Sequence, residues 1–426
     1  MAAEAGQEGL LADSRLLKAD FVFYCASIPG GLALSVKMEG EKGLTGGFDL
    51  IHIFNKAKSL WKRETVGCIG GILALLSMAV VPPGPVYAGY IDLRVLCLLF
   101  CLMAVVLGLQ ECGLFHLLAQ SLLAGKRRLR LLRVFLVLLP FFCSMAVTND
   151  VALLTFVPFA VLVLSLIGKG RELPYVITLQ TLAANLGSMA TPVGNPQNLY
   201  LYAKYQLTAA DFFRVMLPLT LASLLGLLAA SLWGRSGGEW VQVSFQKREK
   251  LRHPGRLGVY AVLFVLCLLS VFRLLHYGIL TAVVVASLLC ISPGLLKRVD
   301  YGLLLTFVFF FIFAGNIGQM EGLRQLLDRL MKDGALVCSI LASQVVSNVP
   351  AAVLLSGFTE DWTGLLMGVN IGGLGTPIAS LASLISLKFY LRTEGARPLY
   401  YLAVFTLANL AGLALLLALA AVLPGM

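Results

Sequence analysis

The stretch Cys143-Ser144-Met145-Ala146-Val147-Thr148-Asn149-Asp150-Val151-Ala152 places three polar side chains in the middle of a long apolar run. The flanking arms, 131–147 and 151–167, are almost entirely apolar, and each holds at most about one bilayer's worth of residues. A carboxylate at the bilayer centre costs at least about 2.5 kcal/mol, so Asp150 is expected to face protein or a water-filled cavity on a transport path. Taken alone, Thr148-Asn149-Asp150 is equally compatible with an ordinary surface turn between two full spans.

The pattern occurs a second time near the C-terminus, as Ser347-Asn348-Val349-Pro350-Ala351. A second pair of strings follows these hydroxyl-Asn motifs: Asn185-Leu186-Gly187-Ser188-Met189-Ala190-Thr191-Pro192-Val193 and Asn370-Ile371-Gly372-Gly373-Leu374-Gly375-Thr376-Pro377-Ile378. Asn, Gly, Thr and Pro match at identical spacing, and Gly with Pro makes a continuous helix improbable. Paired, interrupted apolar segments in two halves of a chain point to a transporter binding site. We infer an internal duplication in which a helix of each half is broken.

Composition agrees with a polytopic membrane protein, because the 426 residues are 59% hydrophobic and 13% charged, with a mean hydropathy of +0.88. The net charge of +11 does not indicate a nucleic-acid partner, since the basic residues fall in short loops, where they orient a protein in the bilayer. Nine Cys without Cys-x-x-Cys and four scattered His predict neither a disulfide framework nor a metal site.

The predicted fold is an all-α polytopic membrane protein with an inverted-topology repeat, two re-entrant hairpins and two broken transmembrane helices. Five spans lie between Asp92 and Asp300, the residues that open the two repeats, and an odd number places the repeats in opposite orientations. The basic loops then all face the cytoplasm, as does the N-terminus, in a multi-pass protein of the inner or plasma membrane. The predicted regions are an N-terminal cytoplasmic or peripheral extension (1–60), a first repeat region (61–234) with a hairpin (131–168), a cytoplasmic linker (235–256), and a second repeat region (257–426) with a hairpin (334–358).

These motifs resemble those of the ion transporter superfamily, which holds the divalent-anion/sodium symporters, citrate carriers, arsenite permeases and one group of sodium/proton antiporters. The resemblance covers roughly 62–426, and in that family the hydroxyl-Asn motifs lie at hairpin tips that meet near the midplane. It implies a secondary active transporter that moves a small anion, either a di- or tricarboxylate or an oxyanion, by alternating access. We expect the small anion, the lipid bilayer and a second copy in a homodimer as partners, and no cofactor apart from Na⁺ as a coupling ion.

Each predicted site residue belongs to a motif, to a Gly-Thr-Pro string or to the segment that follows a string. The resemblance implies substrate contacts from Thr148, Asn149, Asp150, Asn195, Ser347, Asn348, Thr376 and Pro377. It implies ion contacts from Asn149, Asp150, Asn185, Gly187, Thr191, Asn348, Asn370, Gly372 and Gly375. Amides, hydroxyls and helix N-termini hold an anion, and freed carbonyls coordinate a cation, so the pocket needs no Lys or Arg.

The chain departs from the Ser-Asn-Thr pattern of the sodium/dicarboxylate symporters, since Asp150 and Val349 take the third positions. A carboxylate there is able to gain and lose a proton, so proton coupling competes with sodium coupling and is slightly favoured. An arsenite/antimonite-type permease, a Na⁺/H⁺ antiporter of the same superfamily and a channel also stay open. An intramembrane enzyme is not expected, because the sequence has no His-Glu-x-x-His and no Gly-x-Ser-x-Gly. For Asn185, Asn370, Gly187 and Gly372, a purely structural role in close helix packing competes with ion binding.

Overall fold

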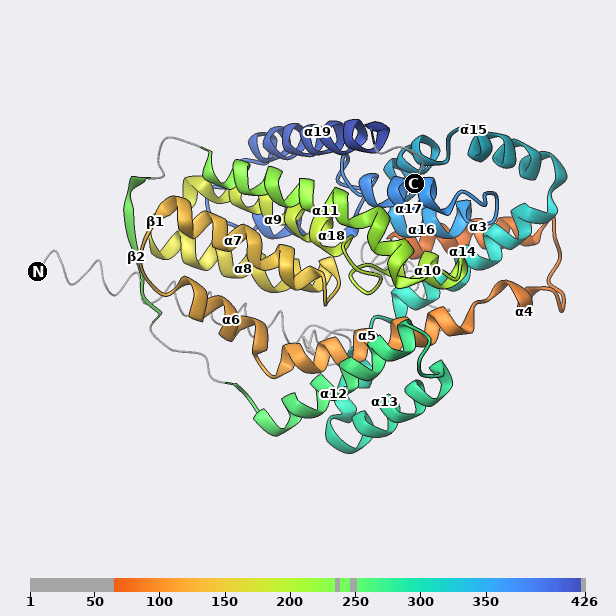
Figure 1. Cartoon of the computed structure of the whole chain (residues 1–426), viewed down its shortest axis with the longest axis horizontal. Helices are drawn as coiled ribbons and strands as arrows, with labels where there is room; N and C mark the ends of the chain where they lie inside the picture. The colour runs from red at the N-terminus through yellow and green to blue at the C-terminus, as the bar shows by residue number, and fades with distance from the viewer. Residues whose placement is uncertain (1–64, 234–237, 246–250, 423–426) are drawn as a thin grey trace, which may run out of the picture.

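Helices make up most of the structure, a computed structural model that describes residues 65–233, 238–245 and 251–422, apart from the side chain of residue 333 (Figure 1). The predicted extension 1–60 lies outside these residues. Six described helices are long and apolar enough to cross a membrane: α5 (Leu93–Glu111), α8 (Asn149–Leu166), α11 (Ala209–Leu232), α12 (Pro254–Val271), α14 (Tyr301–Gln319) and α19 (Pro398–Val422). The protein is therefore an all-α polytopic membrane protein, as the sequence predicts.

The other helices are shorter or interrupted. In the first half they are α3 (Thr65–Met78), α4 (Tyr87–Tyr90), α6 (Leu114–Leu123), α7 (Leu129–Ser144), the 3₁₀ turn η1 (Gly170–Glu172), α9 (Leu173–Ser188) and α10 (Pro196–Lys204). In the second half they are α13 (Tyr277–Ile291), the 3₁₀ turn η3 (Pro293–Arg298), α15 (Glu321–Val346), α16 (Asn348–Leu355), α17 (Trp362–Ile371) and α18 (Leu381–Leu391). Within α15, Gly334 leaves helical geometry and divides the helix in two. The predicted second hairpin begins at this kink.

The two halves repeat one order of elements. In the first half the order is α5, α6, the α7–α8 hairpin, the broken pair α9 and α10, and α11. In the second half it is α14, the first part of α15, the hairpin formed by the second part of α15 and α16, the broken pair α17 and α18, and α19. Each repeat opens with an aspartate cap: Asp92 accepts from Val95 N (3.1 Å), and Asp300 from Leu303 N (2.9 Å). The helix breaks are confirmed, since α9 and α17 end where the Gly-Thr-Pro strings begin to turn.

Contacts between the halves are reciprocal. The half-helix α18 packs on α8 of the other repeat, and α10 packs on α16 in the same way, while α11 packs on its counterpart α19. In Figure 1, α6 lies at the end of the molecule that carries the strands, and α15 lies at the opposite end. This arrangement is the one expected of two repeats in opposite orientations. That the hairpins are re-entrant stays a prediction.

A small β-ribbon was not predicted. The basic segment β1 (Gly125–Arg128) pairs antiparallel with β2 (Trp240–Val243), which lies in the predicted linker. The Lys126 ammonium and the Arg128 guanidinium lie over the Trp240 ring, at 5.7 and 5.5 Å from its centroid. The basic segment therefore forms one strand of a two-stranded ribbon and not the simple loop that its charge indicated.

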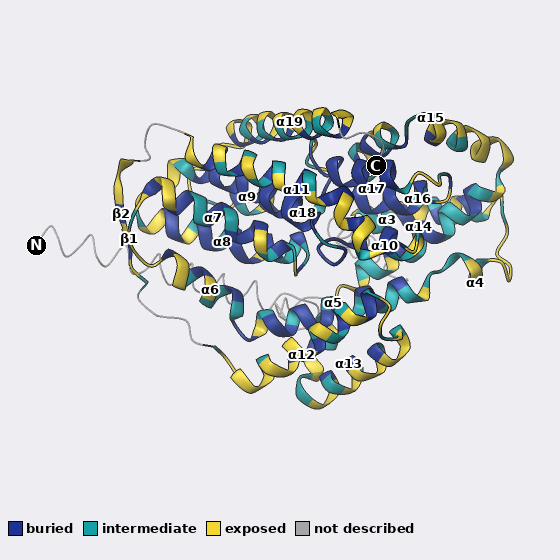
Figure 2. Ribbon diagram, viewed as in Figure 1, coloured by how far each residue is buried: buried dark blue, intermediate teal, exposed yellow. Residues whose placement is uncertain are grey.

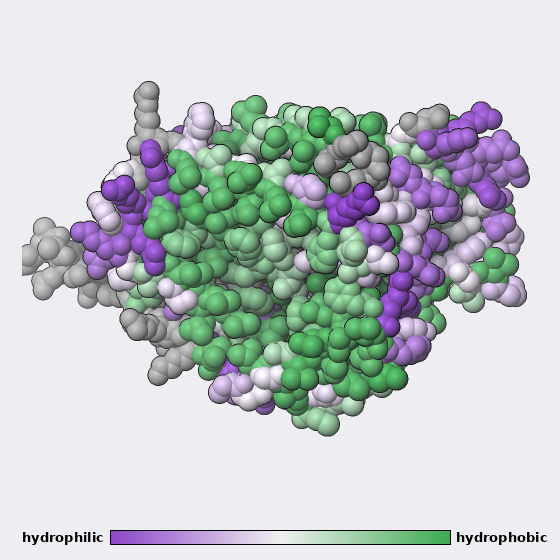
Figure 3. Space-filling model, viewed as in Figure 1, coloured by the Kyte–Doolittle hydropathy of each residue, from purple (hydrophilic) through white to green (hydrophobic). Residues whose placement is uncertain are grey.

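The surface separates into an apolar middle and polar ends. Figure 2 shows buried residues along the inner helices and exposed ones along outer helices such as α19, and Figure 3 shows hydrophobic residues across the middle of the visible face. Hydrophilic residues gather over the β-ribbon at one end and over α15 at the other. Exposed leucines such as Leu225 and Leu410 belong to spanning helices, as expected of side chains that meet lipid.

Candidate functional site

The first hydroxyl-Asn motif lies at the turn between α7 and α8. Thr148 precedes the first residue of α8, and Asn149 is buried. The Asn149 Oδ1 atom accepts from the backbone N–H of Asp150 (3.0 Å), while its Nδ2 donates to Asn185 Oδ1 (2.9 Å). The side chain thus caps the start of its own helix and also ties the hairpin tip to the first broken helix.

The second motif repeats the local geometry between α15 and α16. Asn348 Oδ1 accepts from the N–H of Val349 (2.9 Å), as Asn149 does from Asp150. The Asn348 N–H and the Ser347 hydroxyl both donate to the carbonyl of Ala379, at 3.1 and 3.3 Å. Ser347 has φ +75° and ψ 157°, a region that is essentially restricted to glycine. Such strain is typical of functional sites, where surrounding contacts hold the backbone in place.

The break of each half meets the hairpin of the same half through equivalent hydroxyls. Thr191 Oγ1 donates to the carbonyl of Met145, and Thr376 Oγ1 donates to that of Gln344 (3.4 Å). Met145 and Gln344 each lie three positions before the motif hydroxyl. In each half, the break is therefore in contact with the hairpin that carries the motif.

Hydrogen bonds also join the two halves. Asn185 Oδ1 accepts from Ser380 Oγ of the second half (3.0 Å) as well as from Asn149, and its Nδ2 donates to Gly373 O (3.5 Å). Asn370 Nδ2 donates to Asn198 Oδ1 of α10 (2.7 Å). Predicted residues that are far apart in the sequence thus belong to one buried region.

Two amides in this region were not predicted. Asn198 Nδ2 lies 3.2 Å from the Thr191 carbonyl oxygen and 3.5 Å from those of Ser188 and Met189. Gln344 Nε2 donates to Gly372 O (2.7 Å) and Leu374 O (2.9 Å). Side-chain amides therefore bond carbonyls that the helix breaks leave without helical partners. For Gln344 the available signal was an amide within a largely apolar segment, whereas Asn198 follows Asn195 and Gln197 in a polar stretch.

Several buried polar atoms around this network have no hydrogen-bond partner among the described residues. They are Asp150 Oδ1, Asn195 Oδ1, Gln197 Nε2, Asn370 Oδ1 and Ser383 Oγ. Leaving such an atom unsatisfied costs about 1–3 kcal/mol, and native proteins rarely do so without a reason. The sequence predicted Asp150, Asn195 and Asn370 but missed Gln197 and Ser383. Together these atoms offer a ligand both donors and acceptors.

The remaining predicted residues have other surroundings. A Cβ at Gly187 would overlap the carbonyl oxygen of Phe141, and one at Gly372 would crowd Ser343, which supports the packing role for both glycines. Gly375 has φ +112°, which favours glycine. Thr376 is exposed and Pro377 is half-buried, so these two lie nearer the surface than the motif asparagines. An ion-binding role for the glycines stays a prediction.

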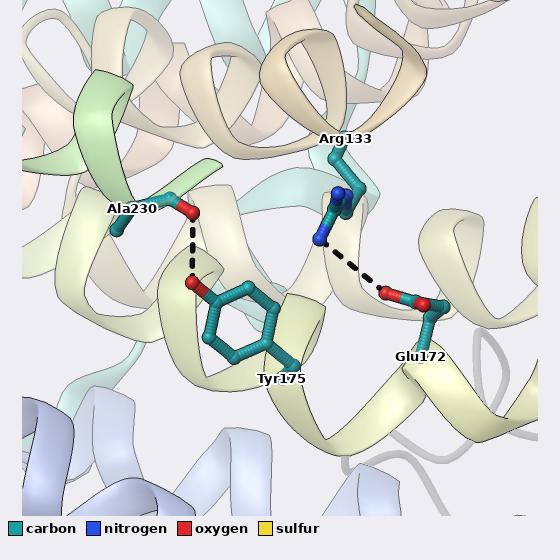
Figure 4. Close-up of polar contacts among 4 residues, drawn as sticks. All are labelled: Arg133, Glu172, Tyr175 and Ala230. Atoms are coloured by element: carbon teal, nitrogen blue, oxygen red, sulfur yellow. Dashed lines mark hydrogen bonds and ion pairs between the residues drawn. The ribbon is translucent and has the colours of Figure 1, made fainter. Parts of the chain in front are cut away.

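A buried arginine anchors the base of the first hairpin. Arg133 of α7 is 3% exposed, and its Nη1 lies 3.6 Å from Glu172 Oε2 in η1 (Figure 4). Its Nε and Nη2 have no partner among the described residues. Beside this pair, the Tyr175 hydroxyl of α9 donates to the Ala230 carbonyl of α11 (2.7 Å). Arg133 thus ties the hairpin base to η1, while Tyr175 joins the two neighbouring helices α9 and α11.

No group of three or more His, Cys, Asp or Glu that would hold a metal ion occurs within the described ranges. The site therefore consists of amides, hydroxyls, backbone groups and the Asp150 carboxylate. None of the side chains named in its network is basic.

Comparisons with known proteins identify the family of the chain. The citrate transporter (CitMHS) family model matches residues 50–359. An uncharacterised transporter of Methanocaldococcus jannaschii is 30% identical over 320 residues, which cover 75% of this chain and 86% of that protein. An inner membrane protein of Escherichia coli is 31% identical over 304 residues (70% and 80%), and a silicon efflux transporter of Oryza sativa subsp. japonica is 31% identical over 179 residues (42% and 36%). The chain is therefore a membrane transporter that belongs to the citrate transporter family.

Proposed function

We propose that the protein is a secondary active transporter that carries a small anion, a di- or tricarboxylate or an oxyanion, by alternating access at this site. The observation that carries the proposal is the single buried network that joins Asn149 and Asn185 of one repeat to Ser380 and Gly373 of the other. A site shared by two repeats opens to either side of a membrane when the repeats move relative to one another.

Anion binding is supported by four helices that begin at the network. They are α8, α10, α16 and α18, whose first residues are Asn149, Pro196, Asn348 and Leu381. Helix N-termini carry partial positive charge and free N–H groups, and both favour an anion. Asn348 Nδ2 and Gln197 Nε2 add side-chain donors without partners in the described structure. An anion is therefore bound without a Lys or Arg beside it.

Asp150 is our candidate for coupling. One of its carboxylate oxygens is buried without a partner among the described residues, and the residue opens the first turn of α8. A buried carboxylate oxygen is stable only when it binds a proton or a cation, or meets hydrogen-bond donors. We favour proton over sodium coupling, and either ion would bind next to the anion.

Uptake by purified protein in liposomes tests the site. Asn149→Ala and Asn348→Ala should each abolish citrate uptake, because each removes an amide at a hairpin tip. Asn316→Ala is the matched control, since this buried amide of α14 bonds Ser77 and Tyr87 away from the network. Normal uptake by both tip variants would place the pocket elsewhere. Counterflow of labelled citrate separates a carrier from a channel, because only a carrier exchanges substrate against its gradient.

The coupling ion is tested in the same liposomes. An inward proton gradient without sodium should drive uptake, and Asp150→Asn should stop or uncouple it because the amide does not titrate. Uptake that requires sodium, ignores the proton gradient and survives Asp150→Asn would contradict proton coupling.

A hydroxylated, uncharged solute is the second candidate substrate. The similarity to a silicon efflux transporter favours it, and the lack of a basic side chain among the network residues named above is compatible with a neutral solute. Parallel uptake of citrate, arsenite and silicic acid separates the two substrate classes. Uptake of silicic acid or arsenite but not citrate would replace the anion proposal.

A further inference from the structure

A cavity of about 400 Å³ lies outside the candidate site, beside the start of α5. Its walls come from α4, α5, α10, α13 and α14, and they include Gly89, Tyr90, Asp92, Arg94 and Lys204. No residue of the hydroxyl-Asn motifs or of the breaks lines it. Its volume is in the range of ligand pockets, about 300–1,000 Å³.

Two cations and one carboxylate line this cavity. Arg94 and Lys204 make no ion pair and no hydrogen bond within the described residues, although Arg94 is half-buried. The one carboxylate of the lining, Asp92, already accepts a hydrogen bond from Val95 N at the start of α5. The Tyr90 hydroxyl is buried without a partner in the described part of the chain. With two cations and one carboxylate, the lining therefore carries a net positive charge.

The cavity and the site share a helix. α10 has nine residues and so spans about 13 Å. Asn195 and Asn198 lie at its first turn, in the buried region of the site, whereas Tyr200 and Lys204 reach the cavity further along. The Tyr200 hydroxyl also bonds Ser356 at the end of α16 (2.6 Å). A solute in the cavity is therefore one short helix away from the candidate site.

We propose that this cavity is an anion vestibule, in which Arg94 and Lys204 concentrate a small carboxylate or oxyanion before it reaches the buried site. A cleft whose lining has a net charge raises the local concentration of an oppositely charged solute. As a path to the site, the vestibule rests on the proposed transport of an anion. Its electrostatics are testable without any transport.

A cysteine at Gly89 reports the charge of the cavity. Gly89 is exposed, and a Cβ built there meets nothing within 4 Å, so Gly89→Cys is expected to fold normally. We would compare its rates of disulfide formation with sulfonatoethyl and trimethylammonioethyl methanethiosulfonate, which carry opposite charges. The labelling of the parent protein, which keeps its native cysteines, is subtracted. The ratio of the rate with the negative reagent to the rate with the positive reagent should be higher for Gly89→Cys than for a free thiol in solution.

Removal of either cation should reduce this preference. Arg94→Gln and Lys204→Gln, each in the Gly89→Cys protein, should lower the anion-to-cation rate ratio by roughly two- to five-fold at low salt. Lys204→Arg should keep it. Arg214→Gln is the control, because Arg214 is an exposed cation on α11 that does not line the cavity. An unchanged ratio in both Gln variants, or an equal fall in the control, would overturn the vestibule.

Uptake kinetics then connect the vestibule with transport. Arg94→Gln and Lys204→Gln should raise the KM for citrate several-fold and leave the maximal rate within about two-fold, since the buried site is untouched. A loss of maximal rate with unchanged KM would contradict a concentrating role. The labelling ratio tests the charge of the vestibule even if the protein transports no anion. A normal labelling ratio without anion uptake would count against the proposed function and not against the vestibule.

Discussion

Asn185→Ala offers the sharpest test of the link between the two repeats. The change removes the acceptor of two buried donors, Asn149 Nδ2 at 2.9 Å and Ser380 Oγ at 3.0 Å. Each orphaned donor costs about 1–3 kcal/mol, and local relaxation recovers part of the sum. We therefore expect a loss of about 2–4 kcal/mol in the free energy of unfolding, together with a loss of uptake. Ser380→Ala should cost only about 1 kcal/mol, because Asn185 still accepts from Asn149.

A double-mutant cycle in mixed micelles, unfolded by titration with dodecyl sulfate, measures these free energies. In the Ser380→Ala background, Asn185→Ala orphans one donor fewer, so the cycle should show a coupling of about 1 kcal/mol. Thr181→Ala is the control on the same helix, because this buried hydroxyl donates to Ile177 O within α9 and should couple to neither. Additive losses, or an Asn185→Ala protein as stable as the parent, would refute the shared acceptor.

Three further outcomes follow from named contacts. Ser347→Gly and Ser347→Ala should both slow uptake by removing a hydroxyl, but the Gly protein should be about 1 kcal/mol more stable than the Ala protein in the same titration, because only Gly relieves the positive φ. Glu172→Gln should lower the free energy of unfolding by at least about 1 kcal/mol by leaving Arg133 buried without its counter-charge, whereas Arg133→Met should cost less, because the Glu172 side chain that it leaves unpaired is 21% exposed. Cysteines at Lys126 and Lys204 should react with impermeant reagents from opposite sides of a sealed membrane, and labelling from one side would contradict the inverted repeat.

The elements of the fold could be predicted because their signals are local. Asp92 and Asp300 are helix caps in the structure, and both mark the start of a repeat as the sequence indicated. Gly and Pro ended α9 and α17 because neither residue sustains a helix there. The β-ribbon escaped prediction because β1 consists of basic residues without strand alternation, and its partner Trp240 lies far away in the sequence. Long-range pairing of this kind leaves little trace in composition.

The candidate site was predictable to the extent that it is repeated. The motif asparagines and Asn185 stand out because equivalent residues recur, and the structure brings them together. Asn198 and Gln344 were missed because the duplication gives them no counterpart: Asn198 lies after its break, and Gln344 lies before its motif. Each one nonetheless bonds the carbonyls of a break.

This difference between the halves has a consequence for transport. Gln344 lies on the hairpin arm of the second half, so its bonds to Gly372 O and Leu374 O tie the second break to a separate element. Asn198 lies on α10, which continues directly from the first break, so its bonds stay within one chain segment. Among these side-chain bonds, movement of a hairpin relative to its broken helix would therefore release carbonyls of the break itself in the second half, whereas in the first half it would release the hairpin carbonyl of Met145. A carbonyl freed in this way becomes an acceptor for a cation. If a cation is coupled to transport, we therefore expect the second break to be where a change of conformation most directly changes its affinity.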